Sequence, residues 1–239
     1  MSTPAIPSGE IEIKDPAFKF IKERARILLL LDSAERAGVA PLTASRLHAL
    51  AYLADVLSPV WGLKPFDGKI LKIEGGPHYP DIQSQVDELV ILGLVNVKNL
   101  HYVDRPDGGA RIDGLYELSF TSIHLEPILR ALGAGAQGDA IDPRDCRAHR
   151  FLIDLAGALA TLPDDEIDKA ATFDATYANE IIGESNIVDF SKQIEAEFPI
   201  NRSVAVTERF QHFLPQDSSL TSGEKLYLYA AYLGKRMHG

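Results

Sequence analysis

Residues 70–118 read ILKIEGGPHYPDIQSQVDELVILGLVNVKNLHYVDRPDGGARIDGLYEL, and the elements expected there are the most informative feature of the chain. The stretch begins with a short apolar run at 70–73 and a Gly75-Gly76-Pro77 break, and apolar residues then recur at helical spacing over 79–93. Two runs typical of β-strands follow at 94–103 and 111–118, and the polar, glycine-rich loop 104–110 between them favours a hairpin turn. The stretch therefore predicts a strand, a helix and a β-hairpin, in that order.

Two further helices are predicted upstream of this stretch. Asp15-Pro16 is a favourable helix start, and apolar residues repeat at helical spacing from there to a stop at Gly38. A second helix is expected over 42–57, where leucine and alanine form a broad apolar stripe. Two helices followed by a strand, a helix and a hairpin give the order of a winged helix-turn-helix domain, which we place at 16–132. Residues 1–15 are expected to form a flexible arm.

The second half of the chain is predicted to be a separate, all-helical domain over 142–239. Residues 133–138, GAGAQG, match the G-x-G-x-x-G pattern of dinucleotide-binding loops, but a helix rather than a strand is expected before them. We therefore interpret 133–141 as a linker. The predicted fold class is mainly α with a small β-sheet. The helices expected after the linker cover 142–161, a segment from 163, and 173–182, 187–198, 204–214 and 221–235.

Composition limits the classes of partner and compartment. The 24 Lys and Arg residues against 34 Asp and Glu give a net charge of -10, which disfavours binding to a polyanion such as DNA. The single cysteine, Cys146, excludes an intramolecular disulfide and indicates a reducing compartment. Residues 1–12 lack the features of a signal peptide, and the longest apolar run, 27–31, is too short to cross a membrane. We expect a cytoplasmic protein with no membrane contact.

The expected outward face of the third helix also disfavours DNA reading. A helix that enters the major groove offers Arg, Lys, Asn or Gln, and acidic side chains there are repelled by phosphates. Arg105 and Arg111, on either side of the hairpin turn, are the candidate nucleic-acid contacts, but Asp104, Asp107 and Asp113 offset their charge. The outward positions of the third helix hold Gln83, Ser84, Asp87 and Glu88.

No catalytic, cofactor-binding or metal-binding residues are expected from motifs. The seven histidines show none of the spacings H-x-H, H-x-x-x-H or H-E-x-x-H. A G-x-S-x-G nucleophile elbow and a G-x-x-x-x-G-K-[ST] phosphate loop are also missing from the sequence. An enzyme whose groups converge only in the folded chain stays open as a third interpretation.

Aromatic residues supply the candidate partner-binding positions. Trp61 and Phe66 lie in the loop before residue 70 and are either a lid on the core or a contact surface. The tyrosines of the last helix either pack internally or meet another chain. Two residues just before the third helix complete the candidate set. The additional candidates are Tyr227, Tyr229 and Tyr232 in the last helix, and His78 and Tyr79.

Three segments carry a resemblance to a known family. The segments LAYLAD at 50–55, LKIEGGPHYPDIQ at 71–83 and VDELVILGLV at 86–95 resemble the middle components of bacterial ABC-type three-component conflict systems. That group is similar to the small accessory subunit of Lamassu-type antiphage defence. The most distinctive part is the Gly-Pro-x-Tyr-Pro-Asp element before a helix that ends in Leu-Gly-Leu-Val. The likeness lies within the first 120 residues.

The resemblance implies an adaptor protein rather than an enzyme. It implies an accessory subunit of an antiviral or anti-plasmid defence complex, which joins an SMC-like or ABC-type ATPase to an effector such as a nuclease. No cofactor is implied. The alternative, from the winged-helix order alone, is a DNA-binding transcriptional regulator.

Overall fold

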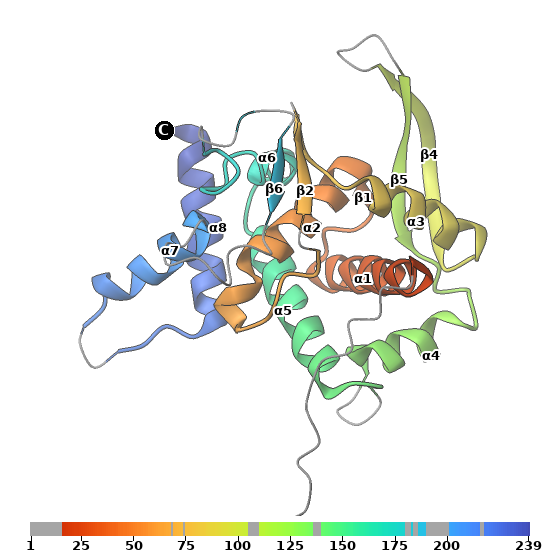
Figure 1. Cartoon of the computed structure of the whole chain (residues 1–239), viewed down its shortest axis with the longest axis horizontal. Helices are drawn as coiled ribbons and strands as arrows, with labels where there is room; N and C mark the ends of the chain where they lie inside the picture. The colour runs from red at the N-terminus through yellow and green to blue at the C-terminus, as the bar shows by residue number, and fades with distance from the viewer. Residues whose placement is uncertain are drawn as a thin grey trace, which may run out of the picture.

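The computed structural model of the 239-residue chain describes residues 16–67, 69–73, 75–104, 110–135, 140–179, 183, 186–189, 201–215 and 218–239. The predicted arm at 1–15 and Arg105 lie outside these residues. The described part is mainly helical and contains two three-stranded antiparallel sheets (Figure 1). The predicted class, mainly α with a small β component, is thereby confirmed.

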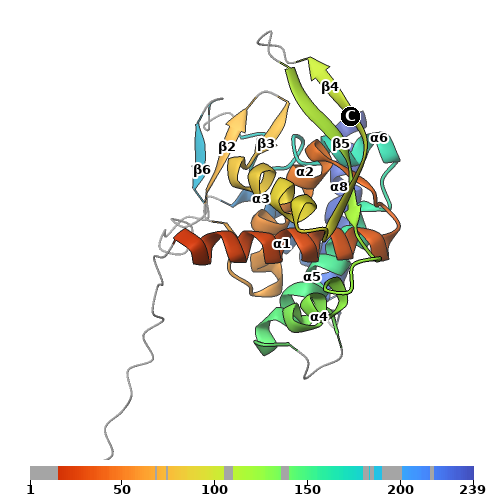
Figure 2. The same cartoon turned by 90° about the vertical axis from the view of Figure 1, so that its right-hand side faces the viewer.

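Helix α1 (Pro16–Ala37) runs through the middle of the molecule, as Figure 2 shows. From Ile27 to Leu31 every side chain is buried, because α2, α3 and α5 pack around this part of the helix. Gly38, with φ at +73°, follows the last helical residue, a conformation that glycine adopts without the steric cost of a Cβ atom. The first predicted helix is confirmed.

Helix α2 (Ala44–Leu57) is the most buried helix among those described, with almost all of its side chains inside. The Thr43 hydroxyl accepts a hydrogen bond from the backbone N–H of Arg46 and caps its first turn. A short 3₁₀ turn, η1 (Ser58–Trp61), continues the chain and ends at Gly62 in the left-handed conformation. The leucine and alanine stripe seen in the sequence is thus one face of an interior helix.

The first sheet holds the predicted hairpin. Strands β4 (Val95–Asp104) and β5 (Ala110–Leu118) pair antiparallel, with Val95 opposite Leu118, and β1 (Leu42–Thr43) pairs with the other edge of β5. The strand order is therefore β1-β5-β4. Helix α3 (Pro80–Ile91) precedes β4, and Gly93 turns the chain between them with φ at +69°.

The second sheet joins the two halves of the sequence. Strand β2 (Lys69–Ile73) pairs on one side with β3 (Gly76–His78) and on the other with β6 (Ile187–Asp189). The expectation of a helix over 187–198 is wrong for its first three residues, and the second half is not purely helical. Three residues are too few for a periodic pattern, and the strand forms because β2 offers it a partner. Residues 190–200 lie outside the described part.

The predicted helix at 173–182 is also wrong, since the described residues 173–179 form turns. The carboxylate of Asp174 accepts hydrogen bonds from the backbone N–H groups of Thr176 and Tyr177, at 2.8 Å and 3.0 Å. Such side-chain capture of backbone donors competes with a helix. The predicted helices near 142, 163, 204 and 221 are found. The helical segments after β5 are α4 (Leu125–Leu129), η2 (Arg130–Ala134), α5 (Pro143–Leu159), α6 (Asp164–Ala170), α7 (Arg202–Arg209), η4 (Phe210–Phe213) and α8 (Ser222–His238).

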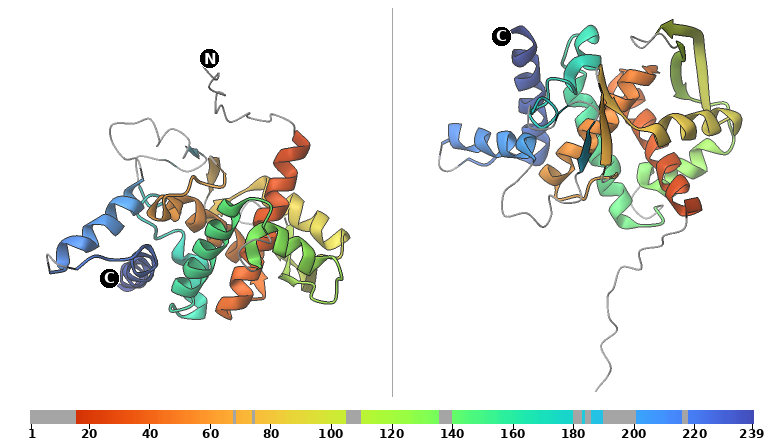
Figure 3. Two further views of the ribbon diagram at one scale, coloured as in Figure 1. Left: turned by 90° about the horizontal axis from the view of Figure 1, so that it is seen from below. Right: turned by 45° about the horizontal axis from the view of Figure 1, so that its top comes forward.

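One hydrophobic core crosses the predicted boundary between the domains. Its buried side chains run from Ile27 in α1 to Leu233 in α8, and α5 packs directly on α1. Gly133 is buried where a Cβ atom would lie 2.6 Å from the backbone of Asp145, so this part of the predicted linker packs tightly against α5. The segment of α3, β4 and β5 and the segment of α7 and α8 lie at opposite ends of the molecule (Figure 3).

Candidate protein-interaction site

Large apolar side chains are exposed where α3 ends and where β5 leaves its sheet. Ile91 and Leu92 are 78% and 54% exposed, and Phe120 and Ile123 are 67% and 82% exposed. The backbone N–H of Ser119 donates to the carbonyl of Leu94 at 3.0 Å and holds the two segments side by side. We name Ile91, Leu92, Phe120 and Ile123 the apolar edge. Clustered exposed apolar residues of this kind are typical of surfaces that bind another protein.

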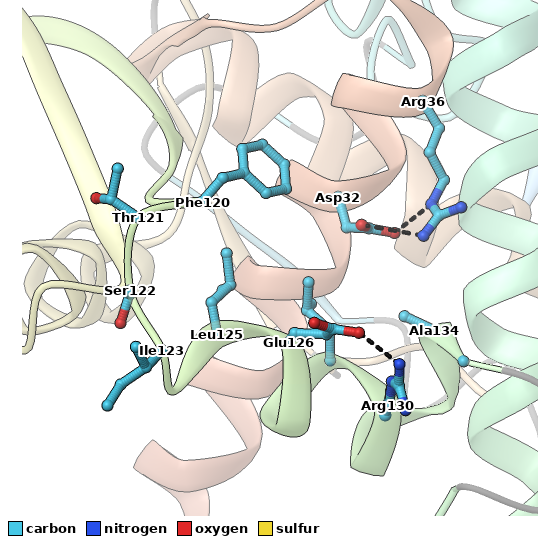
Figure 4. Close-up of a pocket in the computed structure, with 12 residues that line it drawn as sticks. Asp32, Arg36, Phe120, Thr121, Ser122, Ile123, Leu125, Glu126, Arg130 and Ala134 are labelled. Atoms are coloured by element: carbon cyan, nitrogen blue, oxygen red, sulfur yellow. Dashed lines mark hydrogen bonds and ion pairs between the residues drawn. The ribbon is translucent and has the colours of Figure 1, made fainter.

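The apolar edge continues into a pocket of about 760 Å³, which is within the size range of ligand sites in proteins. Phe120 and Ile123 belong to both features. Figure 4 shows the Phe120 ring and Leu125 on one side of the pocket, and Arg36 and Arg130 on the other. The remaining lining residues are Asp32, Thr121, Ser122, Glu126, Leu129, Ala134 and Gly135.

Two ion pairs line this pocket, one within α1 and one between α4 and η2. Nε of Arg36 donates to the buried carboxylate of Asp32 at 2.6 Å, and Arg130 contacts Glu126 at 2.5 Å. Nε2 of His149, on α5, lies 2.7 Å from Asp32. Burial alone would raise the pKa of Asp32, but the hydrogen bonds from His149 and Arg36 outweigh burial and hold that pKa below its usual value.

The pocket does not have the arrangement of a serine nucleophile. In Figure 4 the hydroxyl groups of Thr121 and Ser122 point away from Asp32. A catalytic triad requires a hydroxyl bonded to the histidine, and among the described residues the side-chain partner of His149 is Asp32. Within the described residues, no group of three or more His, Cys, Asp or Glu side chains is placed to hold a metal ion.

A buried charged cluster fixes α1 to α2 and to the loop before β2. Nη2 of Arg26 donates to the Asp55 carboxylate at 2.8 Å, and the Tyr79 hydroxyl donates to the same group at 2.6 Å. Backbone N–H groups of Phe66 and Asp67 donate to the other Asp55 oxygen. Burial raises the pKa of Asp55, and the Arg26 charge opposes that effect.

A second buried cluster joins α2, α7 and α8 around Asp174, which is 0% exposed. The hydroxyls of Tyr52, Tyr229 and Ser203 all donate to its carboxylate. Three hydroxyl donors from three helices therefore meet at one buried acceptor. Both buried clusters use their carboxylates to hold helices together.

The structure buries two of the partner-binding candidates that the sequence suggested. Tyr79 and Tyr229 are 2% and 1% exposed, so the prediction that they bind a partner is corrected: both belong to the buried clusters. Burial, with Asp55 beside Tyr79 and Asp174 beside Tyr229, raises the pKa of both hydroxyls, which therefore stay protonated as donors. They looked like surface residues because sequence spacing does not show which tyrosine meets a buried carboxylate.

The aromatic loop before β2 is a lid on the core. The rings of Trp61 and Phe66 lie 6.2 Å and 6.5 Å from Phe151 on α5, and Arg26 lies over Phe66. Of the two interpretations left open by the sequence, the structure favours packing. Both rings are half-buried, and their free surface is small compared with that of the apolar edge.

The remaining candidates are not part of the apolar edge, and one lies outside the described side chains. Tyr227 is 46% exposed on α8, whereas Tyr232 is half-buried beside Phe210. His78 is half-buried, with its ring 5.1 Å from that of His48. The backbone of Arg111 pairs with Val103 in the hairpin, but its side chain is outside what the structure describes.

Sequence reasoning missed the apolar edge, although one signal for it was present. The inward stripe of α3 is Ile82, Val86 and Leu89, all of which are buried. Ile91 follows this stripe but lies on the opposite side of the helix, and Leu92 is the residue that ends the helix. A polar residue would be expected at such solvent-facing positions. Two adjacent apolar residues outside the stripe and just before Gly93 therefore indicated an exposed contact.

No family model, no curated protein and no solved structure matches this chain. In the part of the chain that the structure describes, none of the helices is both long enough and apolar enough to cross a membrane.

Proposed function

We propose that this chain is a non-enzymatic adaptor subunit that binds other proteins through the apolar edge. The observation that carries the proposal is the exposure of Ile91, Leu92, Phe120 and Ile123 on adjoining segments, with no other described segment covering them. Burying such side chains against a partner contributes roughly 1.5–3 kcal/mol each. The carboxylates of the two buried clusters, in contrast, accept hydrogen bonds from groups of the chain itself.

The resemblance of residues 50–95 suggests which assembly the adaptor serves. We propose a cytoplasmic bacterial defence complex against phages or plasmids, in which the chain joins an SMC- or ABC-type ATPase to an effector such as a nuclease. The order α1, β1, α2, α3, β4, β5, with β1 paired to β5, supports a winged-helix arrangement for the first part of the chain. In that arrangement β2 and β3 are an insertion between α2 and α3.

The charge of α3 favours a protein partner over DNA. Its exposed positions include Asp87 and Glu88, and its first-turn acid, Asp81, forms an ion pair with Lys19 of α1. Arg24 approaches Glu88 at 3.8 Å, so nearby basic groups are already engaged with acids of the same helix. A duplex groove would repel this face, since phosphates surround a helix seated there. A transcriptional regulator is therefore the less favoured function.

Co-purification tests the proposal directly. The chain, carrying an affinity tag, is expressed together with the proteins encoded beside its gene, and we expect an ATPase and an effector to be retained with it. Ile91→Asp is expected to reduce retention of at least one of them by tenfold or more, roughly 1.4 kcal/mol. Phe213→Asp is the matched control, because Phe213 is 84% exposed and lies in η4, directly after α7.

Two outcomes would count against the adaptor. The first is a chain that purifies as a monomer and retains neither protein. The second is equal retention by wild type, Ile91→Asp and Phe213→Asp, which would place binding away from the apolar edge. Thermal unfolding of both variants checks that their fold is intact, since a substitution at an exposed position changes stability by only about 0.5 kcal/mol.

A further inference from the structure

We propose that the pocket between α1 and α4 binds a short peptide segment of a partner protein, in which a large apolar side chain stands next to an acidic one. The inference rests on the proposed adaptor function and adds the chemistry of the segment that is recognised. It is carried by the positions of two arginines, by the apolar wall that faces them, and by the continuity of the pocket with the apolar edge.

The two arginines give the pocket its preference for an acidic side chain. Arg36 uses Nε and Nη2 on Asp32, and Arg130 uses Nη2 on Glu126. Among the described residues, no partner is recorded for Nη1 of Arg36 or for Nε and Nη1 of Arg130. A guanidinium group carries five N–H donors, so both arginines retain donors for an incoming carboxylate.

The paired acids hold these arginines in position without using all of their donors. Asp32 is fixed by His149 as well as by Arg36, which limits the movement of the Arg36 side chain. Arg36 and Arg130 are about half exposed, at 48% and 58% of their side chains, so an incoming group reaches them from solvent. Figure 4 shows the two guanidinium groups on the same side of the pocket, one from α1 and one from η2.

The opposite wall of the pocket gives it a preference for an apolar side chain. Phe120 points into the pocket in Figure 4, and Leu125 and Leu129 form the adjoining surface on α4. A ligand that fills this space thus has an apolar group toward Phe120 and a carboxylate toward Arg36 and Arg130.

The open surroundings favour a peptide over a free metabolite. The pocket continues over Phe120 and Ile123 onto the apolar edge, which a small molecule inside the pocket would leave exposed. A segment of a partner chain fills the pocket and covers the edge together. Anchoring of a side chain in a pocket, with flatter contacts around it, is the usual arrangement of a protein interface.

A selection from random peptides tests this inference without knowledge of the partner. A phage-displayed library of short random peptides is selected on the immobilised full-length protein. We expect enrichment of sequences with Leu, Ile, Phe or Met beside Asp or Glu. A fluorescein-labelled peptide from the enriched set then gives dissociation constants by fluorescence anisotropy.

Substitutions distinguish peptide binding in the pocket from nonspecific attraction to positive charge on the surface. Arg36→Gln with Arg130→Gln is expected to weaken peptide binding by tenfold or more, because charge-assisted hydrogen bonds to the carboxylate are lost. Phe120→Ala is expected to weaken it by a similar factor. The matched control is Arg144→Gln with Arg150→Gln, two exposed arginines outside the pocket, which is expected to bind as wild type does.

Several results would overturn the pocket inference while leaving the adaptor function standing. They are the absence of any enriched sequence, the enrichment of basic sequences, and enriched peptides whose affinity is equal for wild type and the Arg36 and Arg130 double variant. In each case the neighbouring proteins are still retained by the wild-type chain and lost on Ile91→Asp. Loss of the adaptor function itself is recognised separately, because then the neighbouring proteins are not retained at all.

Discussion

The hydroxyls of Tyr52, on α2, and Tyr229, on α8, donate to the same buried carboxylate, that of Asp174, at 2.6 Å and 2.5 Å. These two tyrosines are far apart in the sequence, yet one acceptor connects them. The Ser203 hydroxyl of α7 donates to the same group, so three helices depend on one carboxylate. The connection explains why the last helix is part of the core.

Loss of one of these donors is expected to destabilise the protein measurably. Tyr229→Phe removes a hydrogen bond to a buried charged group, and we expect the free energy of unfolding to fall by about 1.5–3 kcal/mol. Urea denaturation followed by circular dichroism measures the change. Tyr227→Phe, at a partly exposed position on the same helix, is the control and is expected to change stability by no more than about 0.5 kcal/mol. Equal effects of the two variants would contradict the assigned role of Asp174.

Removal of the Arg26 charge is expected to have a larger effect. Arg26→Met leaves the Asp55 carboxylate buried without its cation, and loss of one partner of a buried pair costs about 3–5 kcal/mol. Arg150→Met, which removes an ion pair between Asp154 and a largely exposed arginine, is expected to cost about 1 kcal/mol or less. Chemical denaturation of both variants at neutral pH makes the comparison.

The loss of stability in Arg26→Met is also expected to depend on pH. Burial raises the pKa of Asp55 in the folded chain above its ordinary value of 3.8, and loss of the Arg26 attraction raises it further. Where the folded state binds the proton more tightly than the unfolded state, stability falls as pH rises. The deficit of Arg26→Met relative to wild type is therefore expected to widen as the pH is raised from about 4. A deficit that is constant with pH would show that Asp55 does not respond to Arg26.

Asp32 is expected to give the opposite dependence on pH. Because the pKa of Asp32 is lowered in the folded protein, its contribution to stability is fully present above its ordinary value of 3.8 and is lost as pH falls through the lower, folded value. The difference in unfolding free energy between wild type and Asp32→Asn is therefore expected to shrink on acidification from about pH 6 to about pH 3. Urea denaturation over this range is the measurement, and a difference that grows on acidification would refute the assigned shift.

The acidic face of α3 makes a prediction about nucleic acid. The wild-type chain is expected not to bind duplex DNA at near-physiological salt, whereas Asp87→Lys with Glu88→Lys is expected to introduce weak binding that falls steeply with salt. The control, Asp165→Lys with Glu208→Lys, makes the same change in net charge on exposed acids of α6 and α7. Electrophoretic mobility shift on a mixed-sequence duplex compares them. Tight binding by the wild type would instead favour the regulator.

The elements of the first half were predictable because their signals are local. The proline at the start of α1, the glycines after α1 and α3, and the alternating strands β4 and β5 each specify a backbone state from neighbouring residues alone. The capping box at the start of α8, between Thr221 and Glu224, was predictable in the same way and is present.

Features that depend on distant partners were not predictable in this way. Strand β6 forms because β2 lies beside it, and the turns after Phe173 form because Asp174 captures backbone donors that a helix would otherwise use. The same limit applies to the candidate site. Ile91 and Phe120 are distant in sequence, and only the pairing of β4 with β5 brings their segments together.

The pairing of β2 with β6 limits which recombination events between related genes can give a folded protein. Recombination near residue 133 that replaced either half with a diverged copy would leave β2 beside a mismatched strand and α1 against a foreign helix. An unpaired strand edge promotes aggregation. The two halves are therefore expected to be inherited together. An exchange between related genes is expected to yield a folded protein only when its crossover lies outside the coding region of both halves.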